Sequence, residues 1–109
     1  MNLVEIIIKD IDVFVGRDPA SLDLFTMAIE KEWGTRLLLA KEIYHSEPVY
    51  LEREIASELN LLDLVKQRYL ASEEFERCGR IQSLQERLKS ENGIDLFITE
   101  FIKRNNIIS

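Results

Sequence analysis

The most constraining feature of the sequence is a ladder of apolar residues in its C-terminal half, spaced mostly three or four positions apart. The ladder consists of Leu51, Ile55, Leu59, Leu62, Val65, Tyr69, Phe75, Cys78, Ile81, Leu84 and Leu88. Residues at this spacing lie on one face of an α-helix, and here Glu, Arg, Lys and Gln fill the other faces. The ladder therefore predicts amphipathic helices that need an apolar surface to cover them, either within the chain or on another protein.

The size and composition of the chain predict a single domain over residues 1–109. With 46% hydrophobic and 31% charged residues, the balance is that of a globular protein. No apolar run approaches the roughly 20 residues that a membrane-spanning helix needs. The first segment contains Glu5, Asp10 and Asp12 and lacks the basic start of a signal peptide. We therefore expect a cytoplasmic protein with no membrane partner.

Net charge bears on the class of partner. The chain carries 20 acidic and 14 basic residues, a net charge of -6. Binding to phosphate backbones depends on clustered Lys and Arg, and this sequence has no such cluster. We therefore predict no direct binding to nucleic acid. The acids are spread along the chain and mixed with bases, so the sequence shows no acidic tail.

Apolar spacing and punctuating residues predict an all-α fold, a compact bundle of five to six helices with a long C-terminal antiparallel helical hairpin. The expected helices cover residues 3–15, 19–33, 35–45, 48–71, 73–91 and 95–104. The first segment is rich in Ile and Val, which also suits a strand. We favour a helix there because no other stretch alternates with period two to pair with a strand.

Glycine, proline and small polar residues set the expected helix ends. Gly16 is expected to end the first helix in a left-handed conformation, and Asp18-Pro19 to begin the second. Gly34 is expected to separate the second helix from the third. Ser46-Glu47-Pro48 and Ser72 are expected to begin the fourth and fifth helices, respectively. Asn92-Gly93 is expected to close the fifth.

Three groups of residues could carry chemistry, but each has an ordinary structural explanation. Glu42-x-x-His45 matches half of a di-iron site in helical bundles, but the chain has one His, so we expect a solvated helix end. Cys78 could be a nucleophile, but its ladder position predicts a buried core residue. Glu73, Glu74 and Glu76 are expected to be helix-start acids, because no calcium-binding loop sequence accompanies them. We predict no metal site and no cofactor.

The sequence also lacks the motifs of common catalytic sites. It has no Gly-rich phosphate loop, no Gly-x-Ser-x-Gly elbow and no paired Cys motif. With a single His and a single Cys, acid–base catalysis would rest on carboxylates, Lys and Tyr alone. We therefore predict that the protein is not an enzyme.

One segment resembles a known motif. Phe75-Glu76-Arg77-Cys78-Gly79-Arg80-Ile81, followed by Leu84 and Leu88, resembles the second helix of the UvrB/UvrC-type helical hairpin. Residues 62–71 would then correspond to its first helix. Gln82-Ser83 stand where the family commonly has an Arg-Asp pair. The resemblance covers roughly a third of the chain and implies a helical hairpin used for protein–protein association, including pairing with a like hairpin.

Together these features predict a protein-binding module, a small acidic adaptor, regulator or inhibitor that acts through a helical apolar face. The partner would be another protein. The chain could also bind a second copy of itself and so form a homo-oligomer. The expected binding residues are Phe75, Ile81, Leu84, Leu88, Phe97, Phe101, Ile107 and Ile108. The alternative is an acidic inhibitor or immunity-type protein, such as those of phages, that blocks the basic nucleic-acid-binding surface of a target.

Overall fold

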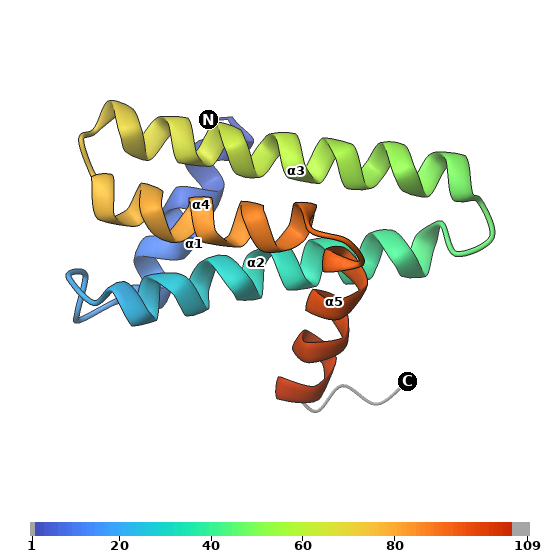
Figure 1. Cartoon of the computed structure of the whole chain (residues 1–109). Coiled ribbons are helices and arrows are strands. Elements are labelled where there is room, and N and C mark those ends of the chain that lie inside the picture. Colours follow the sequence, from blue (N-terminus) through green and yellow to red (C-terminus); the bar gives the residue numbers. More distant parts are fainter. Residues whose placement is uncertain (1, 106–109) are drawn as a thin grey trace.

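Five helices make up the described part of the chain, residues 2–105 of a computed structural model (Figure 1). They are α1 (Leu3–Val15), α2 (Leu22–Ile43), α3 (Pro48–Ala71), α4 (Phe75–Lys89) and α5 (Gly93–Arg104). No strand occurs in residues 2–105. The all-α prediction is therefore confirmed, and the Ile- and Val-rich first segment is a helix.

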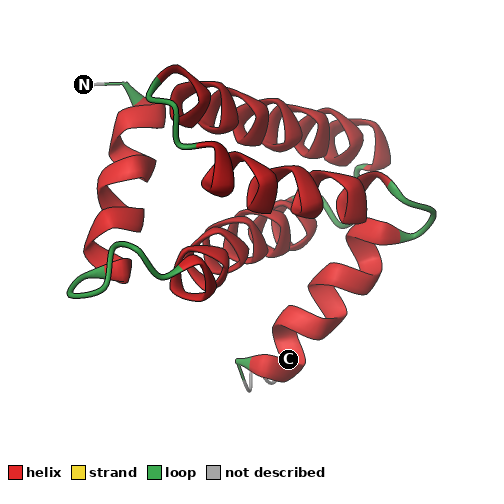
Figure 2. Cartoon of the chain, turned by 60° about the vertical axis from the view of Figure 1, so that its left-hand side comes forward, coloured by secondary structure: helices red, strands yellow, loops and turns green. Residues whose placement is uncertain are grey.

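The helices are arranged around α2, which packs against every other helix. In Figure 1, α2, α3 and α4 run along one common direction, and α1 and α5 cross them steeply. Figure 2 shows α1 beginning at the N-terminus on the left and α5 running toward the C-terminus at lower right. In this view α1 lies to the left of the other helices and α5 to their lower right.

Most of the ladder is buried within the chain itself. Six of its residues belong to the core, namely Leu62, Val65, Tyr69, Ile81, Leu84 and Leu88. They pack with α1 and α2 residues such as Ile7, Phe25 and Trp33, which are fully buried. Ile55, Leu59 and Cys78 are partly buried against the same core. The apolar cover that the ladder requires is therefore supplied largely by the chain's own helices.

The predicted break at Gly34 is wrong, because α2 continues through this residue from Leu22 to Ile43. A Cβ added to Gly34 would lie 2.3 Å from a ring carbon of Phe101 on α5. The glycine therefore makes room for an aromatic ring instead of ending a helix. The predicted start at Asp18-Pro19 is also wrong, since Ser21 caps α2 by accepting a hydrogen bond from the Leu24 N–H.

Gly16 ends α1 as predicted, with a positive φ of 51° that favours glycine. The predicted entry signal Ser46-Glu47-Pro48 is confirmed, with Glu47 instead of Ser46 as the N-cap, whereas the predicted start of a helix at Ser72 is wrong. Glu47 precedes α3, whose first residue is Pro48, and Ser72 ends α3 instead of starting α4. Asn92 has a positive φ of 59°, but the following glycine opens α5.

Gly93 is the first residue of α5, and it also allows α5 to pack closely on α4. A Cβ at this position would lie 2.0 Å from the carbonyl oxygen of Arg87. The first turn of α5 therefore packs directly against the backbone of the last turn of α4, which only glycine allows. This close approach helps to set the steep direction in which α5 leaves the bundle (Figure 1).

Within residues 2–105, every helix is too short or too polar to cross a bilayer.

Candidate protein-binding groove

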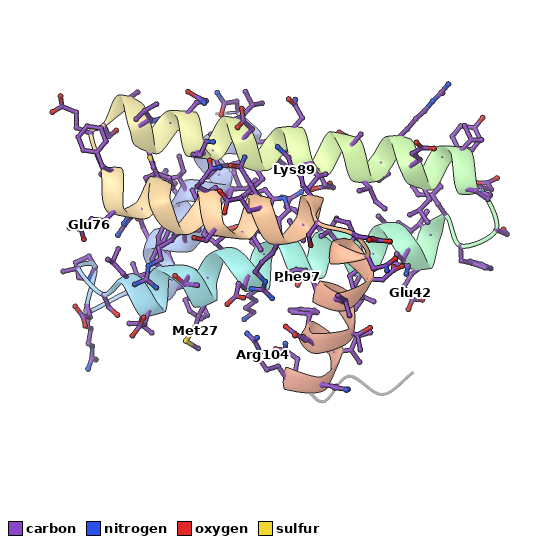
Figure 3. All side chains as sticks on the ribbon, in the orientation of Figure 1. Met27, Glu42, Glu76, Lys89, Phe97 and Arg104 are labelled. Carbon is purple, nitrogen blue, oxygen red and sulfur yellow. The ribbon has the colours of Figure 1, made fainter. Side chains whose placement is uncertain are left out.

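A hollow of about 420 Å³ lies where α5 diverges from α2. We call it the α2–α5 groove. Its lining residues are Phe14, Met27, Glu30, Lys31, Arg87, Phe97, Glu100, Phe101, Arg104 and Asn105. In Figure 3, Met27 on α2 and Arg104 on α5 stand on either side of the angle between these helices.

The apolar part of the groove comes from three helices. Phe97 and Phe101 project from α5, Met27 from α2 and Phe14 from the end of α1. Phe97 is buried, whereas Met27 is 54% exposed and Phe14 is 38% exposed. Because α5 leaves the bundle steeply, these apolar side chains of α1 and α2 are not covered by another helix among the described residues.

A ring of four charged side chains borders the groove. Arg87 on α4 lies 2.8 Å from Glu30 on α2 and 3.1 Å from Glu100 on α5. Arg104 contacts the same two carboxylates at 3.5 Å and 3.8 Å. Two acids and two bases therefore compensate one another, and the ring ties α5 to α2 and α4.

A second, smaller hollow of about 200 Å³ adjoins the first and shares Phe14 and Lys31 with it. Thr35 and Glu32 of α2 and Asp10 of α1 line this second hollow. Met27, Lys31 and Thr35 follow one another at intervals of four residues and are all exposed. The open face of α2 therefore continues from the α2–α5 groove toward α1.

The structure brings only two of the predicted binding residues into the groove, Phe97 and Phe101. Three others, Ile81, Leu84 and Leu88, are at most 4% exposed and belong to the core, so they cannot present a partner surface in the folded chain. Phe75 is 63% exposed but lies at the opposite end of α4. Ile107 and Ile108 lie outside the described residues.

Sequence reasoning missed two apolar residues of the groove. Phe14 and Met27 lie at helical spacing from other apolar residues, so the sequence gives no reason to expect either of them at the surface. Nothing in the periodicity of α1 or α2 distinguishes a residue covered by another helix from one left uncovered. The direction of α5 decides this, and α5 approaches its neighbours closely at Gly34 of α2 and, through Gly93, at the end of α4.

The other chemical candidates do not assemble into a site. His45 is exposed, and its Nδ1 lies 3.2 Å from the carbonyl oxygen of Glu42. No group of three or more His, Cys, Asp or Glu side chains in residues 2–105 could hold a metal ion. Burial raises the pKa of the Cys78 thiol, whose Sγ donates to the Lys66 carbonyl oxygen at 3.5 Å. A raised pKa keeps the thiol protonated and therefore weakly nucleophilic.

A polar cluster within the bundle joins α3 to α4. Gln85 is 4% exposed and is the buried polar residue of the core. Its amide accepts from Lys66 at 2.9 Å and donates to Asp63 at 3.0 Å. The hydrogen bond from Gln85 lowers the pKa of the Asp63 carboxyl. These groups satisfy one another and hold the two helices together, so they do not form a ligand site.

A second polar contact joins α2 to α3. The Trp33 ring is fully buried, and its Nε1 donates to the carbonyl oxygen of Glu58 at 2.9 Å. The Glu58 carboxylate lies 3.6 Å from Arg36, which is too long for a hydrogen bond, and one of its oxygens has no hydrogen-bond partner. Burial raises the pKa of Glu58, and Arg36 opposes this shift.

The chain matches no known protein-family model, no curated protein and no solved structure. A functional hypothesis therefore depends on the geometry and chemistry of the α2–α5 groove.

Proposed function

We propose that this chain is a non-enzymatic protein-binding module, a small acidic adaptor, regulator or inhibitor that binds its partner in the α2–α5 groove. The occupant is a helical segment of another protein that inserts an apolar anchor side chain between α2 and α5. In this proposal α3 and α4 act as a rigid hairpin that supports the groove from behind. The proposal rests on the uncovered apolar surface of the groove.

The uncovered apolar surface supports a protein partner. Met27 and Phe14 expose apolar area beside the rings of Phe97 and Phe101, and exposed apolar grooves commonly mark interaction sites. The exposed face of α2 continues past Lys31 to Thr35, so the binding surface is elongated along this helix. An amphipathic helix presents apolar side chains at intervals of three and four residues and so fits an elongated surface.

The environments of the reactive side chains support a non-enzymatic role. The lone thiol has a raised pKa, and the lone imidazole stands at the solvated end of α2. Neither lines the groove. The groove itself offers Lys, Arg and Glu side chains, and four of its five charged groups are already engaged in ion pairs.

The alternative of an acidic inhibitor of nucleic-acid-binding proteins requires many uncompensated carboxylates on one face. Several carboxylates are instead paired with arginines of the chain. Glu5 lies 2.9 Å from Arg68, and Asp23 lies 3.4 Å from Arg80. Because no observation favours this alternative, we do not propose it.

The proposal can be tested by selecting ligands from a random twelve-residue peptide library displayed on phage. Selected peptides should lose affinity for the Met27→Gln variant by about fivefold or more, because the amide must then be buried in an apolar groove. Leu64→Gln is the matched control. Leu64 is 47% exposed on α3 and does not line the groove, so this variant should bind like the wild type.

Two outcomes contradict the proposal. Selection could yield no peptide that binds the folded protein, or the peptides could bind Met27→Gln and wild type equally well. Circular dichroism of both variants establishes that helicity is retained. Both positions are exposed, so we expect each variant to fold.

A further inference from the structure

Lys31 differs from the other charged residues of the groove because it makes no ion pair within residues 2–105. The ring of Glu30, Arg87, Glu100 and Arg104 contains two acids and two bases, all in ion pairs. Among residues 2–105, Lys31 has no carboxylate within 4.0 Å. Its Nζ lies instead 5.4 Å from the centroid of the Phe14 ring. An ammonium group therefore stands beside an exposed aromatic face of the groove.

Two acids line the adjoining hollow with Lys31, and neither forms an ion pair with it. Glu32 lines the adjoining hollow, but it lies 3.2 Å from Arg36 and is thus engaged in an ion pair. Asp10 lines the same hollow without an ion-pair contact to Lys31. On the side of the larger groove, the uncompensated charge is positive, although the chain as a whole carries a net charge of -6.

This local charge favours one kind of partner segment. Met27 and Lys31 are four residues apart on α2, so they lie on the same side of the helix, one turn apart. A partner whose apolar anchor packs on Met27 and Phe101 can therefore place a carboxylate, about one helical turn away, against Lys31. A Lys or Arg at the same place would meet a like charge.

We propose that Lys31 determines the specificity of the α2–α5 groove by selecting partner segments with an Asp or Glu about one helical turn from their apolar anchor. This inference rests on the proposed protein-binding function. It adds the class of partner: an acidic amphipathic helix that binds an acidic protein through a local basic site. The aromatic ring of Phe14 holds the ammonium at the edge of the groove by a cation–π contact.

The test uses the same phage-displayed peptide library on three proteins: wild type, Lys31→Glu and Lys9→Glu. Peptides selected on wild type should carry Asp or Glu within four positions of an apolar residue, and those selected on Lys31→Glu should carry Lys or Arg there. Lys9 lies on α1 outside the groove, and its replacement changes net charge equally, so Lys9→Glu should select like wild type.

Affinities measured by fluorescence anisotropy extend the test. The Lys31→Glu substitution should lower the affinity of the protein for the best acidic peptide by about two- to fivefold, the range typical of losing an exposed ion pair. Changing the peptide's acid to Lys should restore binding to Lys31→Glu. About 0.5 M NaCl should reduce the difference between the two proteins, because salt screens exposed charges.

The outcomes separate the two proposals. The role of Lys31 is overturned if the peptides need Met27 but show no preference for an acid. It is also overturned if they bind Lys31→Glu as well as wild type. In both cases the groove is still a docking site. Peptides that are indifferent to Met27→Gln overturn the docking site itself. If light scattering shows a wild-type dimer that Met27→Gln converts to monomer, the occupant is a second copy, and the peptide proposal fails.

Discussion

Glu73 has a backbone conformation that favours glycine. Its φ is 59°, directly after the C-terminal end of α3. The Glu73 N–H donates to the Leu70 carbonyl, and the Glu74 N–H donates to the Tyr69 carbonyl. These are the two hydrogen bonds of a Schellman motif, in which the residue with positive φ is usually glycine. A side chain with a Cβ therefore strains the turn between α3 and α4.

We predict that Glu73→Gly stabilises the protein by about 0.5–1 kcal/mol. A residue with a Cβ costs about 1–2 kcal/mol in the left-handed region, and the larger unfolded-state entropy of glycine offsets part of the gain. The free energy of unfolding measured in urea gives the answer. Glu76→Gly is the control, because Glu76 lies in the first turn of α4 and glycine there should destabilise by about 1 kcal/mol. A destabilised Glu73→Gly protein would contradict the account of this turn.

The packing of α5 on α2 depends on Gly34. We predict that Gly34→Ala destabilises the protein by roughly 1 kcal/mol. Alanine improves helix propensity by about 1 kcal/mol, but its Cβ would lie 2.3 Å from the Phe101 ring, and such overpacking costs about 1–3 kcal/mol. Urea unfolding followed by circular dichroism measures the net effect.

Two further variants identify the cause. In a Phe101→Ala background the obstructing ring is absent, so Gly34→Ala should become stabilising by up to about 1 kcal/mol. Gly79→Ala is the matched control, because Gly79 lies within α4 and its Cβ would meet nothing within 4 Å. It should stabilise in either background. A Gly34→Ala effect that does not depend on Phe101 would show that the ring is not what the glycine accommodates.

Glu58 lies at the contact between α2 and α3, and we expect it to make the stability of the folded protein depend on pH. Burial raises the pKa of this carboxyl above its ordinary value of 4.5. A raised pKa in the folded state means that the associated stability is present below pH 4.5 and is lost as pH rises through the folded pKa. Asp63 has the opposite shift, so its contribution is lost only as pH falls below its ordinary value of 3.8.

We therefore predict that Glu58→Gln is more stable than wild type at pH 7, and that this advantage shrinks as pH falls toward 4.5. Glutamine resembles the protonated acid, which the wild type adopts as pH is lowered. Urea unfolding of both proteins at several pH values measures the difference. If Glu58→Gln were less stable at pH 7 by an amount independent of pH, the ion pair with Arg36 would outweigh the burial of Glu58.

At the scale of elements, periodicity predicted the helices but not all of their ends. The ladder and the Ile-rich first segment placed α1, α3 and α4 correctly, because helical amphipathicity is a local property. Gly34 could not be interpreted locally. Its role depends on Phe101, which lies far along the chain and meets it only after α5 has packed.

At the scale of the whole molecule, the sequence predicted that apolar faces need cover without indicating what covers them. Ile81, Leu84 and Leu88 are covered by the chain's own helices, although we expected them to bind a partner. Phe97 and Phe101 do line the groove, but they do so because α5 diverges from α2. That divergence is a tertiary property, and no spacing within α5 encodes it.

The most direct test of the docking groove is an NMR measurement on the methyl group of Met27, which lines the groove and is 54% exposed. The chain has two methionines, so its methionine-methyl spectrum is simple, and Met27→Leu assigns the signal. When a selected peptide is added, the Met27 signal should shift and saturate at the affinity measured by anisotropy. A Met27 signal that stays unchanged while the peptide is bound would contradict the account.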